Sequence, residues 1–271
     1  SQPAITKHIQ ELEAAYQTRL FDRQGSRISL TDSGKLLLEH CERILEDYKR
    51  LEYEMHLLHN EYTGGLKLGA STTIAQYVLP PLLASFIGKF PQVNLSLLNG
   101  NSREIEAALQ EHRIDLGFVE GVFRLPNIKY TTFLEDELVA VVRTGSRLTV
   151  GEEITPEELL HLPLVLRERG SGTLDVFERA LQQHNIKLSS LQVLMYLGST
   201  ESIKLFLEHT DCLGIVSIRS ITRELYSGQL RVVEIKGMPM LRDFSFAQPQ
   251  GQESGLAQVF MQFAMHNNNK L

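Results

Sequence analysis

The feature that most constrains the fold is an alternation of short apolar strands and helices that begins after Gly65. The first series predicts strands at 66–70, 93–99 and 114–119, with helices at 73–90 and 102–110 between them. Such an alternation usually gives parallel strands, because each helix carries the chain back over one face of the sheet. We therefore expect an α/β lobe.

A second series of the same kind begins after Gly145. It predicts strands at 164–166, 192–197, 213–216 and 230–235, with helices at 173–184 and 201–208. A return strand at 244–247 and a last helix at 255–265 should then rejoin the first lobe. The chain would therefore cross twice between two lobes. Their predicted bounds are 66–144 with 247–271 for lobe I, and 145–246 for lobe II.

Hydroxyl side chains gather at three predicted junctions of strand and helix, 71–73, 170–173 and 198–200. Ligands of open parallel sheets bind at the carboxyl ends of strands, and free N–H groups at helix starts favour anions. Arg167 or Arg169 could add a cation there, or could form salt bridges at the surface or between the lobes. Each hydroxyl could also be a plain helix cap. Glu120 could accept a donor of a ligand or be a solvated loop acid.

A long helix is predicted from about residue 32, where Thr31 or Asp32 can cap it. Apolar residues then follow one another by alternating steps of four and three, with charged residues beside them. This spacing predicts a two-helix coiled coil with a second copy of the chain. The seam consists of Leu37, Cys41, Ile44, Tyr48, Leu51, Met55 and Leu58. The pattern breaks at 63–65, which predicts a short hinge.

The chain begins with an amphipathic helix whose polar side faces away from an apolar stripe. The stripe consists of Ile5, Ile9, Leu12 and Tyr16, which can pack on a small core. If the N-terminal end of this helix entered the major groove of DNA, Gln2, Thr6 and Lys7 would contact base edges and phosphates. Turn residues and alternating apolar positions over 24–30 predict a two-stranded ribbon beside this helix, with Arg27 at its tip.

Three motifs in order resemble the recognition helix, wing and linker-helix start of LysR-type transcriptional regulators. They are SQPAITKHIQELE at 1–13, LFDR at 20–23 and LTDSG at 30–34. Gln17 stands where that family usually has Gly, and Ser33 where it usually has Ala. The two predicted lobes are similar to the type 2 periplasmic-binding-protein arrangement with which the family senses effectors. Because a recognition helix packs on preceding helices, we expect about two further helices upstream of Ser1.

The resemblance implies a mixed α+β and α/β protein with three parts. These are a partial winged helix-turn-helix DNA-binding domain at 1–32, a dimerisation helix at 33–63 and an effector-binding domain at 64–271. The expected DNA contacts are Ser1, Gln2, Pro3, Thr6, Lys7, Arg23, Arg27 and Thr31. The effector contacts that the family implies are Ser71, Thr72, Thr73, Ser171, Thr173 and Thr200, to which we add Arg169 for its charge.

Composition excludes several other classes of protein. The net charge of -6 argues against indiscriminate nucleic-acid binding, so any DNA contact must come from a local basic patch. Cys41 and Cys212 are far apart in sequence, which favours a reducing cytosol over a disulfide framework. No apolar run is long enough to span a bilayer. The sequence also lacks the Gly-x-Ser-x-Gly, His-Glu-x-x-His and phosphate-loop motifs of common enzyme classes.

We therefore predict a cytoplasmic DNA-binding transcription regulator, not an enzyme, with no cofactor or metal. Its expected partners are promoter DNA, a small anionic effector, further copies of the chain in a dimer or tetramer, and RNA polymerase, with no membrane. The alternative is an α/β solute-binding or enzymatic protein whose N-terminal helices serve only to form oligomers.

Overall fold

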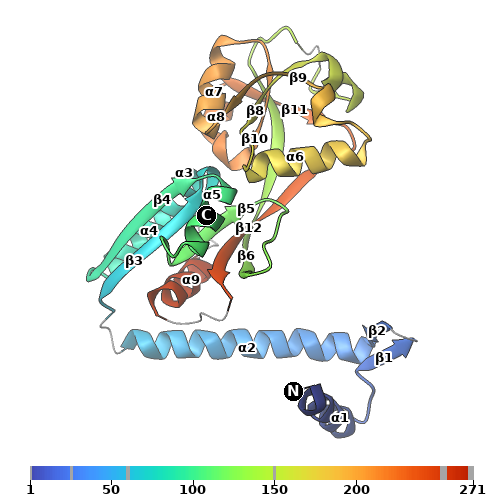
Figure 1. Cartoon of the computed structure of the whole chain (residues 1–271), viewed down its shortest axis with the longest axis vertical. Coiled ribbons are helices and arrows are strands. Elements are labelled where there is room, and N and C mark those ends of the chain that lie inside the picture. Colours follow the sequence, from blue (N-terminus) through green and yellow to red (C-terminus); the bar gives the residue numbers. More distant parts are fainter. Residues whose placement is uncertain (1, 25–26, 59–61, 149–150, 251–254, 268–271) are drawn as a thin grey trace. The chain divides into compact units, whose positions relative to one another are not determined.

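The structure of the protein is a computed structural model that describes residues 2–24, 27–58, 62–148, 151–250 and 255–267. The chain forms two compact units, residues 1–60 and residues 61–271 (Figure 1). Within the described ranges, no helix combines the length and the apolar character that a membrane span requires.

The N-terminal unit has the predicted order of helix, ribbon and long helix. Its elements are α1 (Gln2–Tyr16), β1 (Phe21–Gln24), the antiparallel β2 (Arg27–Leu30) and α2 (Asp32–Leu58). The Glu13 carboxylate accepts from the backbone N–H of Leu20 at 2.8 Å, which ties α1 to the start of the ribbon. A Cβ at Gly34 would lie 2.1 Å from the Leu20 carbonyl oxygen, so only glycine lets α2 pass this close.

Gln17 ends α1 with φ +51°, the left-handed conformation for which glycine is better suited. This explains why a glycine would be expected at this position. Gln17 adopts the conformation at a cost in backbone strain. The predicted apolar stripe of α1 does not lie on a core in the described structure, because Ile5, Leu12 and Tyr16 are exposed.

The predicted seam of α2 lies largely on the surface of a single chain. Side chains at four consecutive seam positions are at least half exposed: Ile44, Tyr48, Leu51 and Met55. Leu37 and Cys41, nearer the ribbon, are half-buried, and the Leu58 side chain lies outside the described residues. A stripe of this kind is what an unpaired coiled-coil helix presents to solvent, so the dimer stays a prediction.

Lobe I has a parallel sheet in the order β4-β3-β5. Its strands are β3 (Gly64–Ser71), β4 (Val93–Gly100) and β5 (Leu116–Glu120), and its helices are α3 (Thr72–Tyr77), α4 (Leu79–Lys89), α5 (Ser102–Gln110) and α9 (Leu256–Asn267). The single helix predicted at 73–90 is thus two helices. Pro80 and Pro81 supply no backbone N–H to an earlier turn, so they start a new helix rather than continue the first.

Lobe II repeats the scheme with parallel strands in the order β10-β8-β9. Its strands are β7 (Glu153–Ile154), β8 (Pro163–Arg167), β9 (Gln192–Leu197), β10 (Leu213–Ser217) and β11 (Leu230–Ile235). Its helices are α6 (Gly172–Gln183), α7 (Thr200–His209) and α8 (Thr222–Tyr226), with 3-10 turns η1 (Glu157–His161), η2 (Leu188–Ser190) and η3 (Ile218–Ser220). The predicted second series is confirmed with small shifts at the element ends.

Two long antiparallel strands, β6 (Ile128–Arg143) and β12 (Met240–Pro249), join the lobes (Figure 1). Arg242 pairs with Asp136 in their register. The sequence pattern did not predict β6. Residues 138–143 of β6 already pair with strands of lobe II, and Phe244 pairs with β5 of lobe I. The chain therefore passes between the lobes near Asp136 and Arg242, rather than at the predicted boundaries 144/145 and 246/247.

Candidate functional site

A network of buried polar side chains connects the lobes where β5, α3 and α6 meet. Glu120, at the end of β5, has one carboxylate oxygen, Oε1, that faces three donors. The hydroxyls of Thr73 and Thr173 each donate to it at 3.4 Å, and Nη1 of Arg242 lies 3.2 Å away. Thr73 belongs to lobe I, Thr173 to lobe II and Arg242 to a crossing strand, so Glu120 links all three parts.

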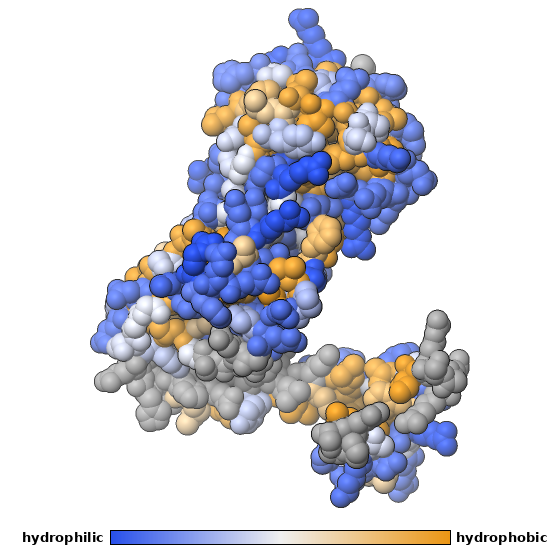
Figure 2. All heavy atoms as spheres, in the orientation of Figure 1, coloured by the Kyte–Doolittle hydropathy of each residue, from blue (hydrophilic) through white to orange (hydrophobic). Residues whose placement is uncertain are grey.

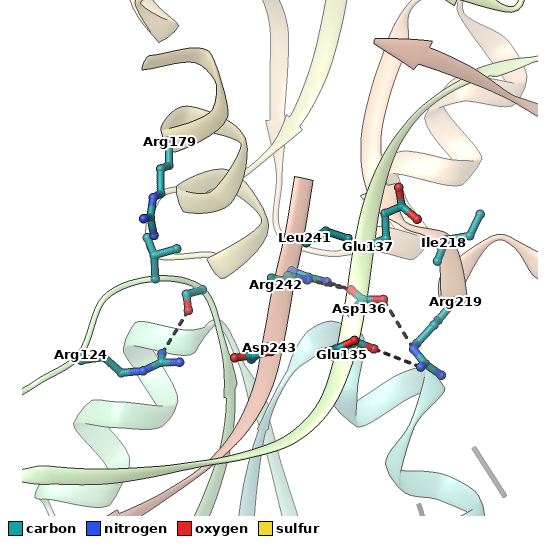
Figure 3. Close-up of a pocket in the computed structure, with 12 residues that line it drawn as sticks. Arg124, Glu135, Asp136, Glu137, Arg179, Ile218, Arg219, Leu241, Arg242 and Asp243 are labelled. Carbon is teal, nitrogen blue, oxygen red and sulfur yellow. Dashed lines mark hydrogen bonds and ion pairs between the residues drawn. The ribbon is translucent and has the colours of Figure 1, made fainter. Parts of the chain in front are cut away.

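Arg242 continues this network along the crossing strands, as Figure 3 shows. Its guanidinium forms an ion pair with Asp136, with Nη2 and Oδ2 2.7 Å apart, and also donates to the Thr173 hydroxyl at 3.0 Å. Asp136 accepts from the Ser217 hydroxyl at 2.7 Å and lies 3.7 Å from Nε of Arg219. Asp136 and Arg242 are buried, so their charges stabilise one another away from water.

Arg167, the last residue of β8, is a second buried cation at this junction, only 1% exposed. Two of its nitrogens donate to Glu168, at 2.8 and 3.0 Å, and Nη2 also donates to the Thr72 hydroxyl of lobe I at 3.3 Å. Its remaining nitrogen, Nη1, is buried and has no hydrogen-bond partner among the described residues. A buried guanidinium N–H without a partner is unusual, because desolvating it is costly.

Oε2 of Glu120 and the hydroxyl of Ser71, at the same junction, are also buried without a hydrogen-bond partner within the described part of the chain. The other such atoms are Oε1 of Gln76, Oε2 of Glu224 and Nη2 of Arg242, the nitrogen that forms the ion pair with Asp136. Ser71 precedes α3, but its side chain makes no cap hydrogen bond. Helix capping therefore does not account for Ser71, whereas it does account for Ser171 at α6 and Ser199 at α7, whose hydroxyls accept from backbone N–H groups.

The backbones of the two lobes lie close together at Gly172. A Cβ there would lie 2.2 Å from the carbonyl oxygen of Glu120, so any side chain would force the lobes apart. A few residues away, the backbone N–H of Arg103 in lobe I donates to the carbonyl of Gly170 in lobe II at 3.2 Å. The glycines predicted to bring backbone close to a ligand thus bring the backbones of the two lobes together.

A second contact between the lobes lies at α3 and α7. The Tyr77 hydroxyl donates to Glu201, and Nζ of the buried Lys204 lies 2.7 Å from carboxylate oxygens of both Glu201 and Glu224. Burial raises the pKa of Tyr77, and its hydrogen bond to Glu201 raises it further, so the hydroxyl stays a donor. These residues line a pocket of about 760 Å³.

Another pocket, of about 610 Å³, opens beside the crossing strands, and its walls include Asp136, Arg219 and Arg242 (Figure 3). It therefore adjoins the buried network from the solvent side. On the face seen in Figure 2, hydrophilic residues cover the region where the lobes meet. Within the described ranges, no group of three or more His, Cys, Asp and Glu side chains is arranged to hold a metal ion.

The structure brings most of the predicted effector residues together at the junction. Ser71, Thr72, Thr73, Ser171, Thr173 and Thr200 are all buried there. Arg169 is exposed, and the buried cation is Arg167, because the two residues lie on either side of the point where β8 ends. Asp136 and Arg242 were missed. Charged residues in strand segments usually indicate solvent-facing positions, and the pairing of these two residues depends on a contact distant in sequence.

The predicted DNA contacts lie in the N-terminal unit, and the structure does not describe the side chains of several of them. Ser1 is outside the described residues, as are the side chains of Gln2, Pro3, Arg23 and Arg27. Thr6 and Lys7 are exposed on α1, and Lys7 lies 3.8 Å from Glu11. The Thr31 hydroxyl donates to the Arg19 carbonyl at 2.7 Å and accepts from the N–H of Gly34, so Thr31 fixes the start of α2.

Known proteins resemble both units. Residues 1–35 match the bacterial regulatory helix-turn-helix protein, lysR family, and residues 59–268 match the LysR substrate binding domain. The Uncharacterized HTH-type transcriptional regulator YeiE of Escherichia coli (strain K12) is 34% identical over 235 residues, which cover 87% of this chain and 78% of YeiE.

Two solved structures have a similar fold. The CcmR regulatory domain of Synechocystis PCC6803, solved in complex with 2-PG, has a TM-score of 0.68 and 27% identity over 75% of this chain and 97% of that one. CbnR, a LysR family transcriptional regulator, shares the fold over 97% of this chain and 90% of its own, with a TM-score of 0.59 and 21% identity. The chain has a helix and ribbon followed in sequence by two α/β lobes, and both units match LysR models. These findings establish that the chain belongs to the LysR family of DNA-binding transcription regulators with an effector-binding domain.

Proposed function

We propose that this regulator responds to a small effector whose anionic group binds at the lobe junction. The observation that supports this most strongly is the unpartnered Nη1 of buried Arg167 beside the unpartnered hydroxyl of Ser71. Both can donate to an anion, and hydrogen bonds to a charged group are about twice as strong as those between neutral groups. The structure of CcmR with 2-PG supports a small ligand for a related domain.

The junction is also suited to passing on a signal. A ligand that touches Ser71 in lobe I and Arg167 in lobe II favours one angle between the lobes. The ligand can shift the equilibrium between two interlobe angles only by the difference between its binding free energies for the two arrangements, commonly about 1 to 3 kcal/mol. The crossing strands near Asp136 and Arg242 are where that angle would change.

We infer that the N-terminal unit binds promoter DNA as part of a dimer through the exposed seam of α2, and that further contacts give a tetramer. This inference rests on the exposed Ile44, Tyr48, Leu51 and Met55. We further propose that the chain acts in the cytoplasm, contacts RNA polymerase at its promoter and has no catalytic activity. The relatives named as transcription regulators support that role.

The effector site is tested by a thermal-shift screen of the full chain against carboxylates, sulfur oxyanions and phosphorylated sugars. A ligand at 100 times its dissociation constant adds about 2.7 kcal/mol of apparent stability. Calorimetric titration of Ser71→Ala with any ligand found should then show a loss of about 1.5 to 3 kcal/mol of binding free energy. Its unfolding free energy should not fall, because the hydroxyl has no hydrogen-bond partner among the described residues.

Ser199→Ala is the matched control, because its hydroxyl caps α7 by accepting from the N–H of Ser202. That variant should lose about 1 kcal/mol of stability and keep its ligand affinity. If Ser71→Ala bound every ligand found as tightly as the wild type, an effector site at Ser71 would be excluded.

A further inference from the structure

We propose that the effector is a zwitterion of the α-amino-acid type, with its carboxylate on Arg167 and Ser71 and its ammonium on Glu120. This inference rests on the proposed function and names the ligand class of the same site. It comes from three of the six buried polar atoms that lack hydrogen-bond partners in the described structure: Nη1 of Arg167, Oγ of Ser71 and Oε2 of Glu120.

The three atoms belong to side chains gathered around a single turn, residues 71–73. Arg167 reaches that turn through its 3.3 Å hydrogen bond to Thr72, and Glu120 reaches it through the 3.4 Å hydrogen bond from Thr73. Ser71 is the first residue of the same turn. The unpartnered groups therefore flank one small region, as the two charged groups on the α-carbon of an amino acid require.

The chemistry of the unpartnered atoms is of two opposite kinds. Arg167 Nη1 is only a donor and suits a carboxylate, whereas an ionised carboxylate oxygen such as Glu120 Oε2 only accepts. A simple anion could bind to the first atom, but it would place negative charge beside the second. An ammonium group supplies the N–H donors that Oε2 lacks. A ligand that carries both groups can satisfy all three atoms.

The test compares ligands that differ only in the ammonium group. The full chain is titrated calorimetrically with each standard L-α-amino acid and with the corresponding amine-free carboxylic acid. At least one amino acid should bind the wild type more tightly than its amine-free partner by at least about tenfold, the value of one charged hydrogen bond. Glu120→Gln should reduce that ratio to near one, because the amide cannot hold an ammonium by charge.

Asp136→Asn is the matched control, since Asp136 is the other carboxylate that pairs with Arg242 but has no unpartnered oxygen. It should keep the preference for the amine. Equal binding of the two ligands of every pair by the wild type, or an amine preference that survives in Glu120→Gln, would overturn the inference. If amine-free acids bind and Ser71→Ala weakens them, the proposed anion site holds and only the zwitterion fails. If no amino acid binds, the zwitterion is excluded whatever the wider screen finds.

Discussion

The interior of lobe I and the junction between the lobes are both buried, but they are held together differently. The lobe interior is a cluster of aromatic rings in which Phe86 lies 4.8 Å from Phe260 and 5.2 Å from Phe263, centroid to centroid. The junction contains the buried charges of Glu120, Asp136, Arg167 and Arg242. Apolar burial is non-directional and stabilising, whereas buried charges gain little net stability and demand a defined geometry.

This difference suggests that the two regions have different tasks. The lobes must remain folded in every state of the regulator, so tight apolar packing suits them. The junction must exchange one arrangement for another when a ligand binds, and hydrogen bonds and ion pairs can be exchanged with a polar ligand.

The largest loss of stability is expected in the lobe interior. Phe86→Ala removes a fully buried ring and should reduce the free energy of unfolding by about 4 kcal/mol in chemical denaturation. Its neighbour Ile87 is 49% exposed, and Ile87→Ala should cost less than about 1 kcal/mol. Similar losses in the two variants would show that lobe I is not packed around Phe86.

Removing one charge of the junction should cost somewhat less. Arg242→Met leaves Glu120 and Asp136 without their shared cation, and should reduce the free energy of unfolding by about 3 kcal/mol. The triple variant Arg242→Met, Glu120→Gln, Asp136→Asn removes the charges together and should recover most of that loss, because no buried charge remains unpaired. A triple variant less stable than Arg242→Met would mean that the ion pairs themselves stabilise the fold.

The same contrast explains what the sequence predicted. Periodicity identified the strands and helices of both lobes, because residues such as Ile105 and Leu109 repeat at the spacing that buries one helix face. It missed β6, in which Glu135 and Glu137 alternate with buried residues, and it selected exposed Arg169 instead of Arg167. The pairing of Asp136 with Arg242 joins residues 106 positions apart in sequence, and Arg167 reaches Thr72, which is 95 positions away. Contacts of this kind are not visible in a local sequence pattern.

The smallest effect is expected at Asp175, in the first turn of α6. Burial raises the pKa of its carboxyl from 3.8 to about 6, partly offset by the nearby charge of Arg103. The folded state therefore binds this proton more tightly than the unfolded state, so its contribution to stability falls as pH rises from about 4 to 6. Because the group is partly exposed, Asp175→Asn should raise the free energy of unfolding by only about 1 kcal/mol above pH 6, and should leave it unchanged near pH 4. Denaturation curves of both proteins at the two pH values would detect this, and an equal difference at both would exclude Asp175 as the cause.

The central claim, that the effector binds at the lobe junction, is tested most directly by hydrogen exchange of the full chain with and without the ligand found by titration. The backbone amides at 71–73, 120–121 and 171–173 should exchange more slowly with ligand, because these residues of both lobes close around it. The exchange rates of backbone amides around the pocket lined by Tyr77 and Lys204 should change less. Protection confined to that pocket, or a bound ligand that leaves 71–73 and 171–173 unchanged, would contradict the claim.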